Sequence, residues 1–135
     1  MFDNMTRTAT CRCGQLSAIC TGEPVRVSVC HCYDCQKRSG SAFAVQARFP
    51  PDAVTISGEH MVYRHVGDSG NAADFHFCPA CGGTLWYHAL PDRALYAIPV
   101  GAFADKSFPT PQYTVYVDRK HDWVTISDEV IEYHD

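Results

Sequence analysis

Cysteine spacing constrains this 135-residue chain more than any other sequence feature. Seven of its eight cysteines fall into CxC, CxCxxC and CxxC clusters: Cys11 and Cys13, then Cys30, Cys32 and Cys35, then Cys78 and Cys81. A structural zinc site is closed by four protein ligands, whereas a catalytic zinc site keeps three and leaves one position open. The seven cysteines are enough for one site of each kind, so we expect a fold that brings distant cysteines together.

The first and last clusters predict the closed site, with Cys11, Cys13, Cys78 and Cys81 as ligands. Glycine follows each pair, at Gly14 and in the segment 78–83 (CPACGG), as in a zinc knuckle, where glycine tolerates positive φ. The long loop between the pairs costs entropy that grows only logarithmically with length. Structural zinc contributes about 10–16 kcal/mol of apparent binding free energy, which offsets that cost. A CxxC redox pair or separate core cysteines would leave the glycines unexplained.

The middle cluster predicts the open site. Side chains alternate along a strand, so Cys30 and Cys32 share one face while His31 points to the other, and Cys35 returns from the first turn of a helix. The local sequence supplies no fourth ligand. Zinc held by three thiolates is a weak Lewis acid, so a soft incoming sulfur suits the open position better than an activated water. We therefore expect a thiol substrate.

A second closed site is the alternative interpretation of this cluster. The candidates for its fourth ligand are His31, Cys20, His76 and His88. Strand alternation argues against His31, and the sequence does not decide among the others. Cys20 on its own is most simply a small buried hydrophobe in the alternation Leu16, Ala18, Cys20.

Short alternating apolar runs separated by Gly, Pro and Asp predict an all-β fold. The expected strands are 25–29, 43–49, 54–57, 61–64, 74–77, 84–88, 95–100, 113–117 and 123–126. The one expected helix is Tyr33–Ser39, ended by Gly40 in a left-handed conformation. Alternation resumes after both proline-rich loops, so we expect a single domain over residues 1–135, built as a β-sandwich or small barrel.

Charge and hydropathy point toward small-molecule chemistry. The chain has 11 Lys plus Arg against 15 Asp plus Glu and no basic tail, which argues against nucleic acid as a partner. Residues 1–10 lack the apolar region of a secretory signal, and no stretch is long enough to span a bilayer. We therefore expect a cytoplasmic protein with reduced cysteines and no membrane contact. The sequence does not indicate an oligomeric state.

The order of the motifs resembles the glutathione-dependent formaldehyde-activating (CENP-V/GFA) family over nearly the whole chain. The likeness rests on CxCG at 11–14, on CHCYDCQKRSGS at 30–41 and on FCPACG at 77–82, with weaker similarity at 100–103 and Trp123. The resemblance implies an all-β fold of small sheets and two zinc ions: a structural one on the four outer cysteines and a catalytic one on Cys30, Cys32 and Cys35. It also implies carbon–sulfur lyase chemistry that joins glutathione and formaldehyde into S-hydroxymethylglutathione.

Glutathione carries two carboxylates, so its groove would offer cations or backbone N–H groups. The cations available are Lys37, Arg38, Arg48, Arg64 and Arg93, each of which also reads as an ordinary surface residue. The predicted contacts are Arg38, Ser39 and Gly40, directly after the zinc loop, although a helix-ending turn explains the last two equally well. His31 and Asp34 are not assigned an acid or base role. Two other hypotheses stay open: a different thiol or a larger aldehyde, and a non-catalytic zinc-stabilised binding module or adduct carrier.

Overall fold

The computed structural model of this chain describes residues 5–90, 94–126, 130 and 132–134, which form two β-sheets and one short α-helix. The smaller sheet has the order β1–β2–β5: β1 (Thr6–Thr10), β2 (Ser17–Thr21) and β5 (Val54–Ser57). The larger has the order β11–β10–β3–β4–β9–β8–β7–β6: β11 (Glu132–Tyr133), β10 (Tyr113–Val115), β3 (Arg26–Cys30), β4 (Ala44–Phe49), β9 (Tyr96–Pro99), β8 (Thr84–Ala89), β7 (Ala72–Phe77) and β6 (Met61–Val66). The helix α1 is Tyr33–Ser39, and short 3₁₀ turns cover Pro51–Ala53, Val100–Phe103 and Val117–Arg119.

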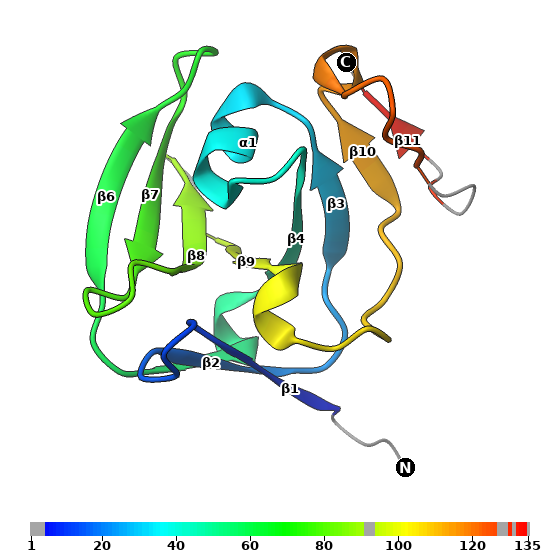
Figure 1. Cartoon of the computed structure of the whole chain (residues 1–135). Coiled ribbons are helices and arrows are strands. Elements are labelled where there is room, and N and C mark those ends of the chain that lie inside the picture. The colour runs from blue at the N-terminus through cyan, green and yellow to red at the C-terminus, as the bar shows by residue number, and fades with distance from the viewer. Residues whose placement is uncertain (1–4, 91–93, 127–129, 131, 135) are drawn as a thin grey trace.

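The larger sheet curves around α1, which lies in its hollow between β7–β8 and β3–β4, while the smaller sheet closes the bottom of the molecule (Figure 1). Most pairings are antiparallel, but β10 runs parallel to both β3 and β11. In that register Val115 lies opposite Cys30, and the amide of His31 donates to the Val115 carbonyl over 3.1 Å. The C-terminal part of the chain therefore covers the end of β3, where the middle cysteine cluster begins.

The core lies between the two sheets. Leu16 precedes β2 in the small-sheet hairpin, Phe49, Leu85 and Ile98 come from the large sheet, and all four are fully buried. Phe103 packs on Phe49 with ring centroids 6.2 Å apart. Each such side chain contributes roughly 1.5–3 kcal/mol on burial, so this core fixes the sheets on which the cysteines stand.

α1 forms because both of its ends are capped. At the N-terminus, the Cys32 side chain accepts a hydrogen bond from the amide of Cys35. Gly40 ends the helix with φ 69°, and its amide donates a hydrogen bond of 2.8 Å to the Gln36 carbonyl. No residue of α1 is buried. The Arg38 guanidinium of α1 lies over aromatic rings of β7 and β8 and so holds the helix against the sheet.

The all-β prediction is confirmed, and the helix has the predicted bounds. Most expected strands form with ends shifted by a few residues, whereas the predicted strand 123–126 is wrong. Val124 instead closes a turn by donating to the His121 carbonyl over 3.0 Å, and Trp123 is 73% exposed. Alternation alone does not make a strand where no described strand pairs with the segment. β1, β2 and β11 are not among the expected strands.

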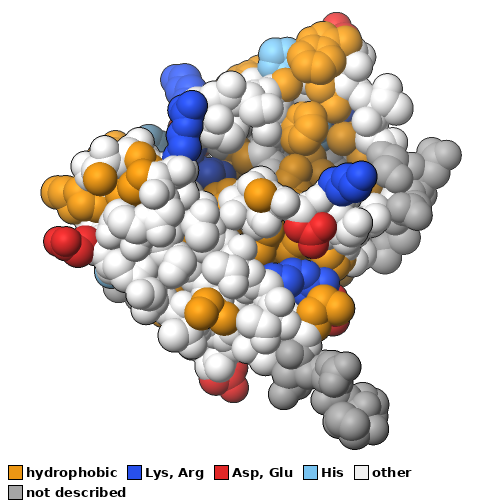
Figure 2. All heavy atoms as spheres, turned by 60° about the horizontal axis from the view of Figure 1, so that its bottom comes forward, with side chains coloured by type: hydrophobic (Ala, Val, Ile, Leu, Met, Phe, Trp, Pro, Cys, Tyr) orange, Lys and Arg blue, Asp and Glu red, His pale blue; other side chains and the backbone are white. Residues whose placement is uncertain are grey.

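The face that carries the smaller sheet is mixed in character. Hydrophobic side chains are scattered over it, and Lys and Arg side chains lie at separate places rather than in one continuous patch (Figure 2). Among the described residues, no helix is long and apolar enough to cross a membrane.

Candidate metal centres and the adjoining cavities

The first and last cysteine clusters meet in space. The sulfurs of Cys11, Cys13, Cys78 and Cys81 all lie within 4.8 Å of one another. The Sγ atoms of Cys11 and Cys13 are 3.6 Å apart, and those of Cys13 and Cys78 are 3.7 Å apart. A tetrahedral zinc ion with Zn–S bonds of about 2.3 Å places its sulfurs about 3.8 Å apart. The donor set therefore fits zinc in both chemistry and spacing.

Two tight turns present these sulfurs. Gly14 has φ 86° and Gly82 has φ 78°, so both knuckles use the backbone conformation that glycine tolerates best. The turns aim N–H groups at sulfur: the amide of Leu16 lies 3.4 Å from Cys11 Sγ, and the amide of Ala80 lies 3.3 Å from Cys78 Sγ. Such donors stabilise thiolates and orient them toward a metal.

Gln15 adds a side-chain donor to the same centre. Its Nε2 donates to Cys78 Sγ over 2.9 Å and to the Glu59 carbonyl over 2.7 Å. Burial raises the pKa of Cys78, but the bond from Gln15 and the amides of Cys81 and Ala80 outweigh it and lower the pKa to about 6. Cys78 thus favours the thiolate form that binds metal.

The middle cluster forms a second group of sulfurs. Those of Cys30, at the end of β3, and of Cys32 and Cys35, at the start of α1, also lie within 4.8 Å of one another. The amide of Cys35 donates to Cys32 Sγ over 3.3 Å. Hydrogen bonds from Cys30 and then Cys35 lower the pKa of Cys32 to about 2, and the bond with Cys32 raises the pKa of Cys30. These directions favour a thiolate at Cys32, stabilised by hydrogen bonds from the other two cysteines.

The structure tests each candidate for a fourth ligand at the middle cluster. His31 is buried on the far side, where its Nε2 lies 2.8 Å from Thr114 Oγ1, and burial lowers its pKa. Cys20 is fully buried in the core, where burial raises its pKa to about 11. His88 bonds to Trp86 Nε1 and to the Leu95 carbonyl, and His76 stacks on Trp86 at 4.4 Å. Within the described residues, no fourth His, Cys, Asp or Glu joins Cys30, Cys32 and Cys35.

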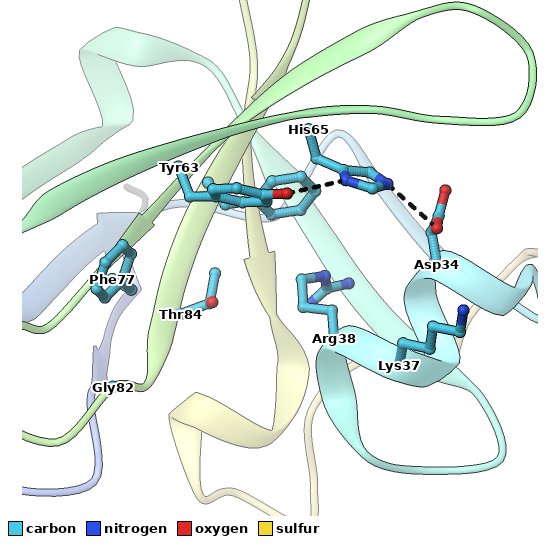
Figure 3. Close-up of a pocket in the computed structure, with 9 residues that line it drawn as sticks. Asp34, Lys37, Arg38, Tyr63, His65, Phe77, Gly82 and Thr84 are labelled. Carbon is cyan, nitrogen blue, oxygen red and sulfur yellow. Dashed lines mark hydrogen bonds and ion pairs between the residues drawn. The ribbon is translucent and has the colours of Figure 1, made fainter.

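Two cavities lie beside this three-cysteine cluster. The larger has a volume of about 360 Å³ and is lined by Asp34, Lys37, Arg38, Tyr63, His65, Phe75, Phe77, Gly82 and Thr84. The smaller, of about 220 Å³, is lined by Cys32, Asp34, Gly67, Asp68, Ser69, Tyr116 and Arg119. Asp34 stands between the two. The larger cavity reaches from α1 at one end to Gly82, next to Cys81, at the other (Figure 3). It therefore connects the surroundings of the two cysteine centres.

Strand pairing explains the wall of the larger cavity. Tyr63 and His65 share one face of β6 because strand side chains alternate, and Tyr63 pairs directly with Phe75 of β7. The opposite face carries Arg64 and Asp74, joined by bonds of 2.7 and 3.1 Å. The β6–β7 hairpin thus turns its aromatic residues and a histidine toward α1.

The predicted substrate contacts separate into two groups. Lys37 and Arg38 line the larger cavity, and Arg38 Nη2 also lies 3.9 Å from Cys35 Sγ. Arg48 is bonded to Ser28, Arg64 is bonded to Asp74, and Arg93 lies outside the described residues. Ser39 and Gly40 form the exposed end of α1 and line neither cavity. Of the four predicted cations that the structure describes, Lys37 and Arg38 are thus the two that line the cavity.

Sequence reasoning missed the opposite wall and the smaller cavity. Tyr63 lies in the predicted strand 61–64 and His65 follows it directly, so their spacing of two is a signal that they share a face. The sequence does not show that this face meets α1. Tyr116 gave no signal, yet it takes a left-handed conformation with φ 56° beside Cys32. Non-glycine residues in this conformation are often found at functional sites. Arg119 lies over the ring of Tyr116 and completes that wall.

Comparison with known proteins agrees with the cysteine geometry. The family described as glutathione-dependent formaldehyde-activating enzyme (GFA) matches residues 6–119 of the chain. The chain belongs to the GFA family. No curated protein matches this chain. Among solved structures, the chain is similar to a Rhodobacter sphaeroides protein, with 17% sequence identity and a TM-score of 0.56 over 95% of this chain and 99% of that one. That likeness shows a shared fold.

Proposed function

We propose that this chain is a zinc-dependent enzyme of the carbon–sulfur lyase type. It would form and break the adduct of formaldehyde, or another aldehyde, with glutathione or a similar thiol, as in S-hydroxymethylglutathione synthesis. Membership of the GFA family supports this chemistry. The observation that carries the proposal is the group of three cysteine sulfurs without a fourth ligand in the described residues, next to two cavities. Cys30, Cys32 and Cys35 are the proposed ligands of the catalytic zinc, and Cys11, Cys13, Cys78 and Cys81 those of the structural zinc.

Zinc bound by three cysteines supplies an open coordination position and favours the deprotonated form of an incoming thiol. The rest of the proposed site belongs to the chain. Cys32 borders the smaller cavity, and Arg38 borders the larger one while it contacts Cys35, so a bound thiol has a route to the cluster from either side. Holding both reactants in one cavity supplies much of the benefit expected of an enzyme for this addition.

The charges of the larger cavity suit a zwitterionic thiol peptide. Lys37 and Arg38 offer cations for two carboxylates, and Asp34 offers an anion for an ammonium group. The aromatic side chains Tyr63, Phe75 and Phe77 form the rest of the wall and exclude water from the bound molecule. Thr84 adds a hydroxyl at the end near the closed cysteine centre. This composition supports a small-molecule substrate such as glutathione.

The alternative, a non-catalytic binding module or adduct carrier with two structural zinc ions, has weaker support. It calls for a fourth protein ligand at the middle cluster, and the residues 5–90, 94–126, 130 and 132–134 offer none. We propose one catalytic domain over the whole chain, because the residues that line the two cavities come from segments between Cys32 and Arg119.

The test is the exchange rate between glutathione, formaldehyde and their adduct, measured by NMR with ¹³C-formaldehyde. The zinc-loaded chain should accelerate the exchange, and Cys32→Ser should abolish the acceleration and lower the bound zinc from two ions to one. Cys20→Ala is the matched control because Cys20 lies in the core, away from both centres. An unaccelerated exchange with two zinc ions bound would refute the proposed activity.

A further inference from the structure

A chain of hydrogen-bonding side chains lies in the wall of the larger cavity. His65 Nε2 lies 3.2 Å from Asp34 Oδ1, and His65 Nδ1 lies 3.4 Å from the Tyr63 hydroxyl. Figure 3 shows the three side chains in sequence, with Arg38 pointing from α1 toward the same region. Asp34 comes from α1, whereas His65 and Tyr63 come from β6. These hydrogen bonds thus connect the helix that carries Cys35 to the opposite wall of the cavity.

The partners of His65 determine which nitrogen carries its proton. A carboxylate only accepts hydrogen bonds, so Nε2–H donates to Asp34, and in the neutral imidazole Nδ1 carries a lone pair that can accept a hydrogen bond. Tyr63 O–H then donates to Nδ1 over a long bond that a substrate hydroxyl of similar reach can replace. An imidazole held by a carboxylate at one nitrogen, with the other aimed into a cavity, is the arrangement used for general acid–base catalysis.

We propose that His65 is the proton-transferring residue of the lyase reaction and that Asp34 is the residue that positions it. This inference rests on the proposed function. In adduct breakdown, His65 Nδ1 takes the proton of the adduct hydroxyl. The O–H electron pair becomes the C=O π bond, the C–S bond breaks, and its electron pair leaves with sulfur as thiolate. Formation runs in reverse: sulfur attacks the carbonyl carbon, and the imidazolium returns the proton to the oxygen.

The other residues of this cavity suit the role less well. Arg38 does not give up its proton, and Lys37 is a strongly hydrated cation suited to binding carboxylates. Asp34 already accepts the hydrogen of His65. Tyr63 donates to His65 and can orient the substrate oxygen from the same side. The side chain of His65 is 37% exposed, so both substrate and external buffer can reach it.

The experiment compares zinc-loaded wild type, His65→Gln, His65→Ala and His60→Gln in the ¹³C-formaldehyde exchange assay. General acid–base catalysis typically contributes 10²–10⁴-fold, so we expect His65→Gln to lose at least about 100-fold of the acceleration. Bound zinc should stay at two ions, and the dissociation constant for glutathione should change by less than about threefold. Added imidazole should restore part of the activity of His65→Ala. His60→Gln, an exposed histidine outside both cavities, should behave as wild type.

The outcomes separate this inference from the proposed function. Wild-type acceleration that persists in His65→Gln overturns the role of His65 and leaves the lyase activity standing. Loss of activity with loss of zinc, or without imidazole rescue, shows a structural role and also overturns it. A wild type that does not accelerate exchange overturns the proposed function and this inference together.

Asp34→Ala tests the positioning role. It should lower the exchange rate at saturating glutathione about tenfold or more while bound zinc stays at two ions, because His65 loses the partner that fixes its proton. Asp34→Asn keeps an acceptor oxygen for Nε2–H and should recover part of the rate. Equal rates for Asp34→Ala and wild type would remove Asp34 from the mechanism.

Discussion

The two cysteine centres use the same ligand atom in different structural settings. The four-cysteine centre joins the hairpin between β1 and β2 to the turn between β7 and β8, which are distant in sequence and belong to different sheets. The three-cysteine centre lies within six residues, at the end of one strand and the start of one helix. The first therefore connects parts of the fold, and the second is the one to which we assign an open position for another molecule.

In the proposed assignment, the position of the ligands along the chain, rather than the ligand type, separates the two roles. A centre that joins distant segments contributes its binding free energy to folding, because the unfolded chain has no such site. A centre formed by neighbouring residues adds little constraint to the rest of the chain. Its surroundings can then hold a cavity rather than a packed core.

The largest expected effect is the loss of stability when a cysteine of the four-cysteine centre is replaced. Cys78→Ser should lose one zinc ion and lower the free energy of unfolding by about 3 kcal/mol or more, because it opens the centre that joins the sheets. Cys32→Ser should also lose one zinc ion but cost less than about 1 kcal/mol. Native mass spectrometry gives the zinc count, and denaturant titration gives the stability. Equal destabilisation by the two variants would contradict the distinction.

The next effect concerns Gly58. The following residue, Glu59, bonds to the Gln15 side chain, which donates to Cys78 of the four-cysteine centre. A Cβ at Gly58 would overlap the backbone carbonyl of Gln15, and φ is 105°. Gly58→Ala should therefore cost at least about 3 kcal/mol and weaken zinc retention at Cys78, which Gln15 contacts. Gly101→Ala is the control, because its Cβ meets no atom within 4 Å. Similar melting temperatures for the two variants would show that the Gln15 loop can shift freely.

A smaller effect concerns glutathione binding in the cavity beside the three-cysteine centre. Arg38→Met should weaken glutathione binding about tenfold, because Arg38 lines the cavity, contacts Cys35 and packs on Phe75 and Tyr87. Lys37→Met should weaken it about threefold, since Lys37 is exposed and held by fewer contacts. Titration calorimetry measures both. Unchanged affinity in Arg38→Met would place the thiol peptide outside this cavity.

The smallest effect concerns the knuckle glycines. Gly82→Ala should cost about 1–2 kcal/mol, because φ 78° strains a residue with a Cβ although space is free around it. Gly40→Ala, at φ 69° after α1, should cost a similar amount. Only Gly82→Ala should also speed zinc loss to a chelator. Equal chelation rates would mean that the knuckle turn does not hold the metal.

The sequence predicted those features that depend on local spacing. The cysteine clusters, the bounds of α1 and the positive φ of Gly14, Gly40 and Gly82 all follow from residues within a few positions of one another. It predicted most strands for the same reason, and it failed at 123–126 because alternation does not reveal whether a neighbouring strand exists.

The rest could not be predicted because it depends on strand register and on the curvature of the large sheet. Asp34 and His65 are far apart in sequence and meet only because the β6–β7 hairpin folds over α1. Arg48 and Arg64 look like Arg38 in sequence, but cross-strand pairing directs them to Ser28 and Asp74. The predicted contacts at Ser39 and Gly40 stay predictions.

The larger cavity ends at Gly82, immediately after Cys81, a proposed ligand of the closed centre. By thermodynamic linkage, if occupancy of that centre improves binding in the cavity, a molecule in the cavity must stabilise the bound metal by the same factor. Glutathione would then slow the loss of a zinc ion that it never touches. The four-cysteine centre would then lose its metal most slowly while a substrate occupies the cavity.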